Sequence, residues 1–145
     1  MSKSNDFEND LVLLVFQNAN AANIGDATGL RGSSTAGNLF ISLHTSDPGE
    51  AGNQSTNEIA YTSYARVQLA RTSGNFTVTA NAVAFAANVD FPAGTGGSGT
   101  ATHFGIGVAT SGSTKLLYKG ALSPSIVCGN GVTPRINAGT VVTED

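Results

Sequence analysis

The first eighteen residues carry apolar side chains at the spacing of an α-helix. Four of them fall on one stripe of such a helix: Phe7, Leu11, Leu14 and Val15. Ser4 or Asn5 can cap the helix, and the helix dipole favours the acidic residues that crowd its first turn. The pattern therefore predicts one helix over residues 5–18. Val12 and Leu13 widen the stripe, so we expect the helix to pack on more than one neighbour, either its own sheet or another subunit.

From residue 39 onward, apolar and polar positions alternate, which is the period of a half-buried strand. The alternating apolar positions are Leu39, Ile41, Leu43, Ala65, Val67, Leu69, Phe76, Val78, Val83, Phe85, Val89, Phe91, Phe104, Ile106 and Val108. Clusters of glycine, asparagine and serine separate the runs at intervals of roughly ten residues. This spacing predicts a mainly β protein, an antiparallel β-sandwich or jelly-roll-like barrel of about eight strands with one N-terminal α-helix.

Between the predicted helix and the first predicted strand lies a long polar arm. Residues 19–37 are mostly small and polar, contain four glycines and show no periodicity. Stretches of this length without secondary structure are uncommon inside a compact domain and usually serve as arms or functional loops. We therefore predict a helix and extended arm over residues 1–37 and a β-barrel or sandwich domain over residues 38–145.

Charged residues make up only 12% of the 145 residues, whereas 40% are hydrophobic. The apolar content is too high for a disordered chain, and a surface of low charge that is rich in hydroxyl and amide groups is typical of a protein packed against other subunits. The net charge of −3 and seven scattered basic residues argue against nucleic-acid binding. The apolar run at residues 11–16 is too short to cross a membrane. We expect a soluble protein without a membrane partner, made in the cytoplasm of the producing cell.

The chain offers few residues for catalysis or for holding a cofactor. Cys128 is the single cysteine, so we expect a buried apolar residue rather than a disulfide or a nucleophile. The loop at residues 94–99 matches G-x-G-x-x-G, but a strand pattern follows it where a dinucleotide site requires a helix. His44 and His103, the two imidazoles, lack companion ligands at metal-binding spacing. We therefore predict no catalytic residue, no cofactor and no metal.

Two clusters of polar residues have alternative interpretations. Three acidic residues lie close in sequence: Asp47, Glu50 and Glu58. They could share a calcium ion, but their spacing is not that of a calcium loop, and we favour a role for Asp47 as the cap of its turn. Three further residues could form an exposed sugar-binding platform: Tyr61, Tyr64 and Arg66. Because Tyr64 and Arg66 share one strand face, an ordinary aromatic–cation pair is the competing interpretation.

A set of short motifs, in order along the chain, resembles a family of tailed-bacteriophage virion structural proteins. The family reads roughly L-x-T-x-D-P-x-x-A-G, then Y-A-R, then F-P, T-H-F-G-I and L-Y-x-G-x-L. Here these pieces stand at residues 43–52, 64–66, 91–92, 102–106 and 117–122. The resemblance covers the chain from about Leu39 to the C-terminus, and its strength lies in the ordered set rather than in any single piece.

The resemblance implies a non-enzymatic capsid decoration (cement) protein on the outer surface of the phage head. Its implied partners are the major capsid protein and copies of itself, as a trimer or dimer. The residues we expect to contact the capsid or another subunit are Phe7, Leu11, Leu14, Val15 and Arg31. A tail or fibre-associated module, such as an adhesin for host glycans, is the alternative. A small hydrolase is a third interpretation, and no motif in the sequence favours it.

Overall fold

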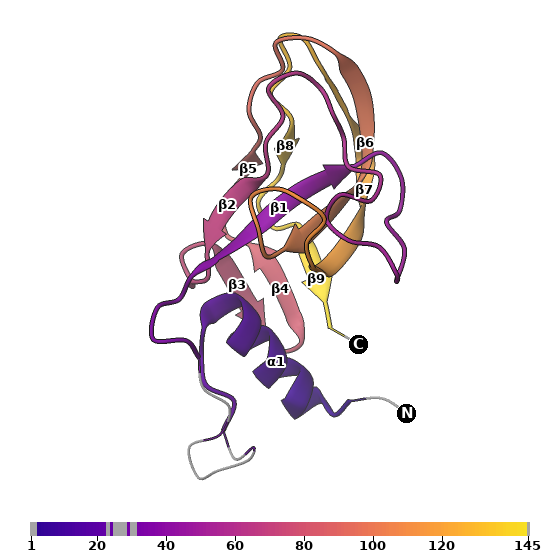
Figure 1. Cartoon of the computed structure of the whole chain (residues 1–145). Coiled ribbons are helices and arrows are strands. Elements are labelled where there is room, and N and C mark those ends of the chain that lie inside the picture. The colour runs from indigo at the N-terminus through magenta and orange to yellow at the C-terminus, as the bar shows by residue number, and fades with distance from the viewer. Residues whose placement is uncertain (1–2, 23, 25–28, 30–31, 145) are drawn as a thin grey trace. The chain divides into compact units, whose positions relative to one another are not determined.

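The computed structural model describes residues 3–22, 24, 29 and 32–144. Within these residues the chain forms one helix and nine strands (Figure 1). The helix is α1 (Asn5–Gln17). The strands are β1 (Asn38–His44), β2 (Val67–Ala70), β3 (Phe76–Thr79), β4 (Ala82–Phe85), β5 (Val89–Asp90), β6 (Ser98–Gly107), β7 (Leu116–Gly129), β8 (Arg135–Ile136) and β9 (Val141–Thr143). The mainly β, antiparallel, sandwich-like class is confirmed. The described strands do not close into a barrel.

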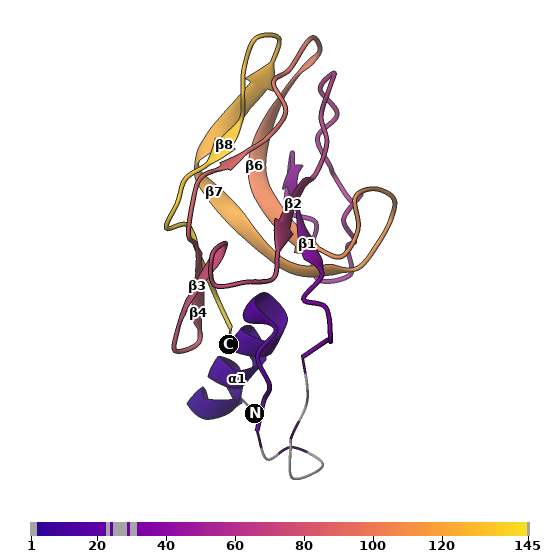
Figure 2. The ribbon, with the colours of Figure 1, turned by 90° about the vertical axis from the view of Figure 1, so that its left-hand side faces the viewer.

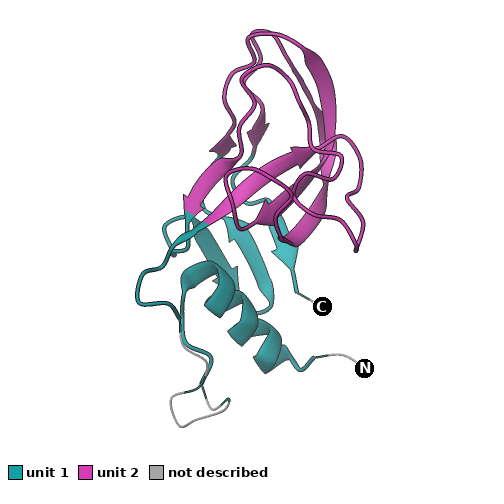
Figure 3. Ribbon diagram, in the orientation of Figure 1, with its two compact units in different colours: residues 1–38, 70–88, 137–145 teal, residues 39–69, 89–136 magenta. Residues whose placement is uncertain are grey.

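The chain forms two compact units whose segments interleave along the sequence (Figure 3). Unit 1 consists of residues 1–38, 70–88 and 137–145, and unit 2 of residues 39–69 and 89–136. Unit 1 therefore combines the predicted helix-and-arm segment with later strands. Whether residues 38–145 fold without residues 1–37 stays a prediction.

In unit 1, helix α1 packs on a small sheet with the strand order β3-β4-β9 (Figure 2). The hydroxyl of Ser4 caps the helix by accepting from the Phe7 N–H at 3.4 Å, as predicted. The apolar side chains that the helix buries are Val12 and Phe16, and the Phe16 ring meets Phe76 edge-on at 5.2 Å. The buried face is therefore not centred on the stripe that the sequence pattern emphasised.

The C-terminal end of helix α1 is held by the Arg71 side chain, which follows β2, and by the side chain of the C-cap residue Asn18, which bonds to the backbone of the arm. The guanidinium of Arg71 donates to the carbonyl oxygens of Leu14, Val15 and Ala36. The Asn18 side chain exchanges two hydrogen bonds with the backbone of Ser33, at 2.7 and 2.8 Å. These contacts satisfy orphan carbonyls at the helix end and bring the described residues of the arm back to the helix.

In unit 2, the main sheet has the strand order β2-β1-β6-β7. Strands β1 and β6 are antiparallel, with Ile41 opposite Ile106 and Leu43 opposite Phe104, and these four side chains are buried. The alternate face of β1 is buried too, because Ser42 and His44 have no exposed surface. Both faces of β1 are thus covered, which is unusual for an antiparallel strand and places polar side chains in the interior.

Candidate functional site

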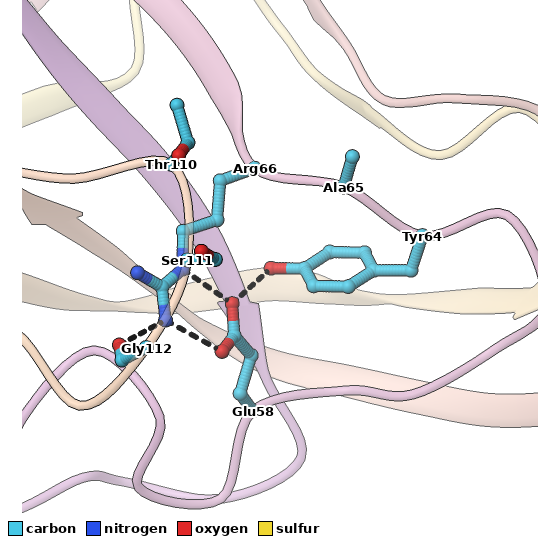
Figure 4. Close-up of a pocket in the computed structure, with 7 residues that line it drawn as sticks. All are labelled: Glu58, Tyr64, Ala65, Arg66, Thr110, Ser111 and Gly112. Carbon is cyan, nitrogen blue, oxygen red and sulfur yellow. Dashed lines mark hydrogen bonds and ion pairs between the residues drawn. The ribbon is translucent and has the colours of Figure 1, made fainter.

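A buried polar cluster of unit 2 is built around Arg66, the last residue of the Y-A-R motif, which directly precedes β2. The Arg66 guanidinium meets the Glu58 carboxylate side by side, with Nε–Oε1 at 2.7 Å and Nη2–Oε2 at 2.8 Å (Figure 4). The Tyr64 hydroxyl donates to the same Oε1 atom at 2.8 Å. This bidentate geometry is the strongest form of arginine–carboxylate pair. We call Glu58, Tyr64 and Arg66 the arginine clamp.

The remaining donors of Arg66 tie the clamp to two loops. Nη1 donates to the Ala109 carbonyl at 3.0 Å, and Nη2 donates to the Gly112 carbonyl at 2.9 Å. Thr114 Oγ1 and Ser55 Oγ supply two further acceptors, at 3.4 and 3.2 Å. All five N–H groups of the guanidinium therefore have acceptors within the protein. The side chain of Arg66 is only 2% exposed, so this cation is used for structure.

A pocket of about 330 Å³ lies over the arginine clamp. Its lining residues are Glu58, Tyr64, Ala65, Arg66, Thr110, Ser111 and Gly112 (Figure 4). The hydrogen bonds that Arg66 donates to the Glu58 carboxylate raise the pKa of Arg66, and burial raises the pKa of the Tyr64 phenol. Both groups therefore keep their protons at neutral pH, and the pocket floor presents a neutralised ion pair rather than a free charge or a base.

Gln54 forms a second buried polar centre beside the clamp. Its side chain has no exposed surface and donates to the Phe40 carbonyl at 3.1 Å. Its Oε1 atom accepts from the Val108 N–H at 2.9 Å, the Ala109 N–H at 3.2 Å and the Thr114 hydroxyl at 2.8 Å. One amide thus satisfies four polar groups from strand β1 and from the loop between β6 and β7. Sequence reasoning missed Gln54, because a single glutamine in a polar loop gives no signal.

Ser42 and His44 form a hydrogen-bonded pair on the covered face of β1. His44 Nδ1 lies 2.8 Å from the Thr56 carbonyl oxygen, which can only accept, so this nitrogen carries the proton. The Ser42 hydroxyl, 2.8 Å from Nε2, then donates to the neutral ring. A serine–histidine pair is a familiar nucleophile and base, but both side chains are fully buried. A substrate therefore has no access to the pair.

Lowering the pH should destabilise unit 2 through His44. Burial lowers the pKa of His44 below its ordinary value, so below about pH 6.5 the unfolded chain binds a proton that the folded chain does not. The free energy of unfolding should therefore fall between about pH 7 and pH 5, by at most about 1.4 kcal/mol per pH unit. Urea titrations at several pH values test this. His44→Gln should flatten the slope, and an unchanged slope in His44→Gln would disprove the assignment.

The motif glycines of β6 and β7 make room for neighbouring side chains. A Cβ atom on Gly105, in the T-H-F-G-I motif, would lie 2.7 Å from His44 Nε2 and from Ser42 Oγ. A Cβ atom on Gly120, in the L-Y-x-G-x-L motif, would lie 2.6 Å from the Phe104 ring. Such distances are too short for any side chain. The motif pieces are therefore linked physically, since each glycine accommodates a residue from another strand or motif.

The predicted turn cap at Asp47 is confirmed. Its Oδ1 atom accepts from the Gly49 N–H at 2.8 Å, and this bond together with Lys119 lowers the pKa of Asp47. The ammonium of Lys119 lies 3.1 Å from carboxylate oxygens of both Asp47 and Glu50. Glu58 instead faces Arg66. The three carboxylates considered for calcium thus serve two different protein cations and do not converge on one point.

The interpretation of Tyr61, Tyr64 and Arg66 as an exposed sugar-binding platform is wrong. Tyr61 is only 2% exposed, and its hydroxyl donates to the Pro92 carbonyl at 2.7 Å; burial raises its pKa to about 12. The Tyr64 ring stacks on Phe91 at a centroid distance of 6.2 Å. The polar ends of Tyr64 and Arg66 meet at Glu58, so an acidic residue joins them.

The glycine loop, Cys128 and His103 lie in or beside strands β6 and β7. The glycine loop at residues 94–99 leads into strand β6, as predicted for a strand connector. Cys128 is buried, as predicted, and burial raises the pKa of its thiol. His103 is partly exposed and lies opposite His44 in the β1–β6 register. Within the described residues, no group of three or more His, Cys, Asp or Glu side chains is arranged to hold a metal, and no helix is long and apolar enough to span a membrane.

The five residues expected at a capsid or subunit contact stay predictions. Phe7 is 38% exposed, and Leu11, Leu14 and Val15 are partly exposed on helix α1. Arg31 lies outside the described residues.

Comparison with known proteins gives one family. Residues 4–144 match the family model described as podophage GP4 fiber I protein gp80. No curated protein matches the chain. The match includes the helix, the arm and every described strand, and so extends the motif resemblance that began at about Leu39.

Proposed function

We propose that this chain, which belongs to the podophage GP4 fiber I protein gp80 family, is a structural subunit of the phage fibre. Membership of the family makes it a phage virion structural protein. The fibre assignment rests on the family's description and on the match over residues 4–144. In this role the chain would supply a surface that contacts neighbouring virion proteins, and its buried polar groups would stabilise unit 2.

The chemistry of the interior supports a structural role. The hydrogen-bonding groups of Arg66, Glu58 and Gln54 are used within unit 2, and every described buried side-chain nitrogen or oxygen has a hydrogen-bond partner. A catalytic site usually keeps a polar group free for its substrate. Fully satisfied polar networks instead make a fold rigid and specific, which is useful in a particle that must survive outside the cell.

Capsid decoration, the role implied by the motif resemblance, is the second candidate. The partly exposed apolar side chains of helix α1 favour it as well as the fibre, because either role needs a surface for a neighbouring protein. The partners would then be the major capsid protein and copies of the chain on the outer surface of the head. The two candidates predict different places in the particle.

Fractionation of purified particles tests the proposal. Particles are dissociated under mild conditions, heads are separated from tails and fibres by sedimentation, and each fraction is probed with an antibody against the chain. The proposal predicts the chain in the fraction that contains fibres. Recovery with intact heads would overturn the fibre assignment and favour decoration. Absence from every fraction would contradict both roles.

A further inference from the structure

Helix α1 presents a second apolar ridge that faces away from the sheet of unit 1. Val12 and Phe16 pack toward β3 and β4, whereas Phe7, Leu11 and Leu14 recur at i, i+4 and i+7 on another side of the helix. Phe7 is 38% exposed, and both leucines are partly exposed. Figure 2 shows strands β3 and β4 on one side of the helix. A helix needs one apolar face for its own core, so the exposed parts of this second ridge are available to a neighbouring protein.

Two carboxylates flank this ridge. Asp6 and Asp10 lie one turn apart on the side of Phe7 and Leu14, and neither has an ion pair within the described part of the chain. Like charges at i and i+4 destabilise an isolated helix. The helix dipole favours Asp6 in the first turn but does not reach Asp10. We call Asp6, Phe7, Asp10, Leu11 and Leu14 the outer helix face.

The charge of the two units indicates what can cover this face. Unit 1 contains three basic and six acidic residues and thus the whole net charge of −3, whereas the four basic and four acidic residues of unit 2 cancel. In unit 2, Lys119 is paired with Asp47 and Glu50, Arg135 with Asp90, and the buried Arg66 with Glu58, so exposed Lys115 is the one basic side chain of that unit without an ion pair within the described residues. A second copy therefore offers little positive surface to the acidic helix, and two helices facing each other would repel.

We propose that the outer helix face docks a different virion protein, through an apolar surface rimmed by lysine or arginine. Such a surface would cover the Phe7, Leu11 and Leu14 side chains and neutralise the Asp6 and Asp10 carboxylates. This inference rests on the proposed function, since it assumes that the chain is assembled into a particle. It deepens that function by naming the chemistry of the neighbour.

The test uses purified full-length chain and phage particles produced without it, with binding measured by co-sedimentation. Phe7→Gln and Phe7→Gln/Leu14→Gln remove apolar surface but keep a good helix former. We expect them to weaken binding roughly tenfold or more, because exposed aromatic anchors dominate interface energetics. The control Val127→Gln, at a 68% exposed valine of β7, should bind like the wild type. Circular dichroism of each variant verifies the fold.

The salt dependence of binding tests the role of the Asp6 and Asp10 carboxylates. Raising the ionic strength should weaken wild-type binding, and Asp6→Asn/Asp10→Asn should weaken binding and remove most of the salt dependence. Glu50→Gln, at an exposed carboxylate of unit 2, should keep both the wild-type binding and its salt dependence. Wild-type binding that is unaffected by the Phe7 and Asp6/Asp10 variants would overturn this inference and leave the proposed function standing. Failure of the wild type to bind would overturn both. Self-association of the chain that Phe7→Gln abolishes would identify a second copy as the occupant instead.

Discussion

Replacing Arg66 with methionine should lower the free energy of unfolding of unit 2 by about 3–5 kcal/mol. The substitution leaves the Glu58 carboxylate, whose side chain is 16% exposed, beside a site that has lost its cation. It also removes the donors to the Ala109 and Gly112 carbonyls. Breaking one half of a buried ion pair costs far more than the pair itself contributes, because the remaining charge stays desolvated.

Tyrosine fluorescence during urea unfolding measures this effect. The chain has three tyrosines and no tryptophan, and all three tyrosines belong to unit 2, so the signal reports on that unit. Arg135→Met is the matched control, because Arg135 also forms a bidentate pair, with Asp90, but both side chains are about half exposed. The control should change stability far less than Arg66→Met does, because solvent screens an exposed ion pair. Equal effects of the two substitutions would contradict the structural role of the arginine clamp.

Replacing Gln54 with leucine should destabilise unit 2 by at least about 3 kcal/mol. Leucine fills similar space but leaves the Val108 and Ala109 N–H groups and the Phe40 carbonyl without their partner. Each unsatisfied buried group costs about 1–3 kcal/mol. Gln68→Leu, at an exposed position of β2, is the matched control and should stay within about 0.5 kcal/mol of the wild type.

The Gln54 and Arg66 substitutions should not be additive. Thr114 Oγ1 donates to Gln54 Oε1 at 2.8 Å and accepts from Arg66 Nη1 at 3.4 Å, so the two centres share a partner. The double variant should therefore lose less stability than the sum of the single losses. Strict additivity would show that the two centres act independently and would contradict a connected network.

Local pattern and local chemistry were sufficient to predict the helix and most of the strands. Helix α1 begins at Asn5, as predicted, directly after its Ser4 cap, and ends one residue before the predicted end, because helical spacing and a serine cap are properties of neighbouring residues. Alternation likewise located most strands. The face of α1 that unit 1 buries was less predictable, because apolar residues surround most of the helix. Only packing on β3 and β4 selects Val12 and Phe16.

The buried polar centres depended on contacts that sequence spacing does not reveal. Alternation places Ser42 and His44 on the face of β1 that would normally meet solvent, but His44 is covered by the segment around Thr56. Arg66 reaches carbonyl groups more than forty residues further along the chain. The arginine of the Y-A-R motif pairs with an acid rather than with an aromatic ring, and only tertiary structure distinguishes these two partners.

The number of copies of this chain per particle tests the fibre assignment most directly. Purified particles are digested, and the chain and the major capsid protein are quantified by mass spectrometry against labelled peptide standards. A fibre subunit should be present in a small, fixed number of copies, far below the number of capsid subunits. A ratio close to a simple fraction of the capsid lattice would contradict the fibre assignment and identify the chain as a decoration protein.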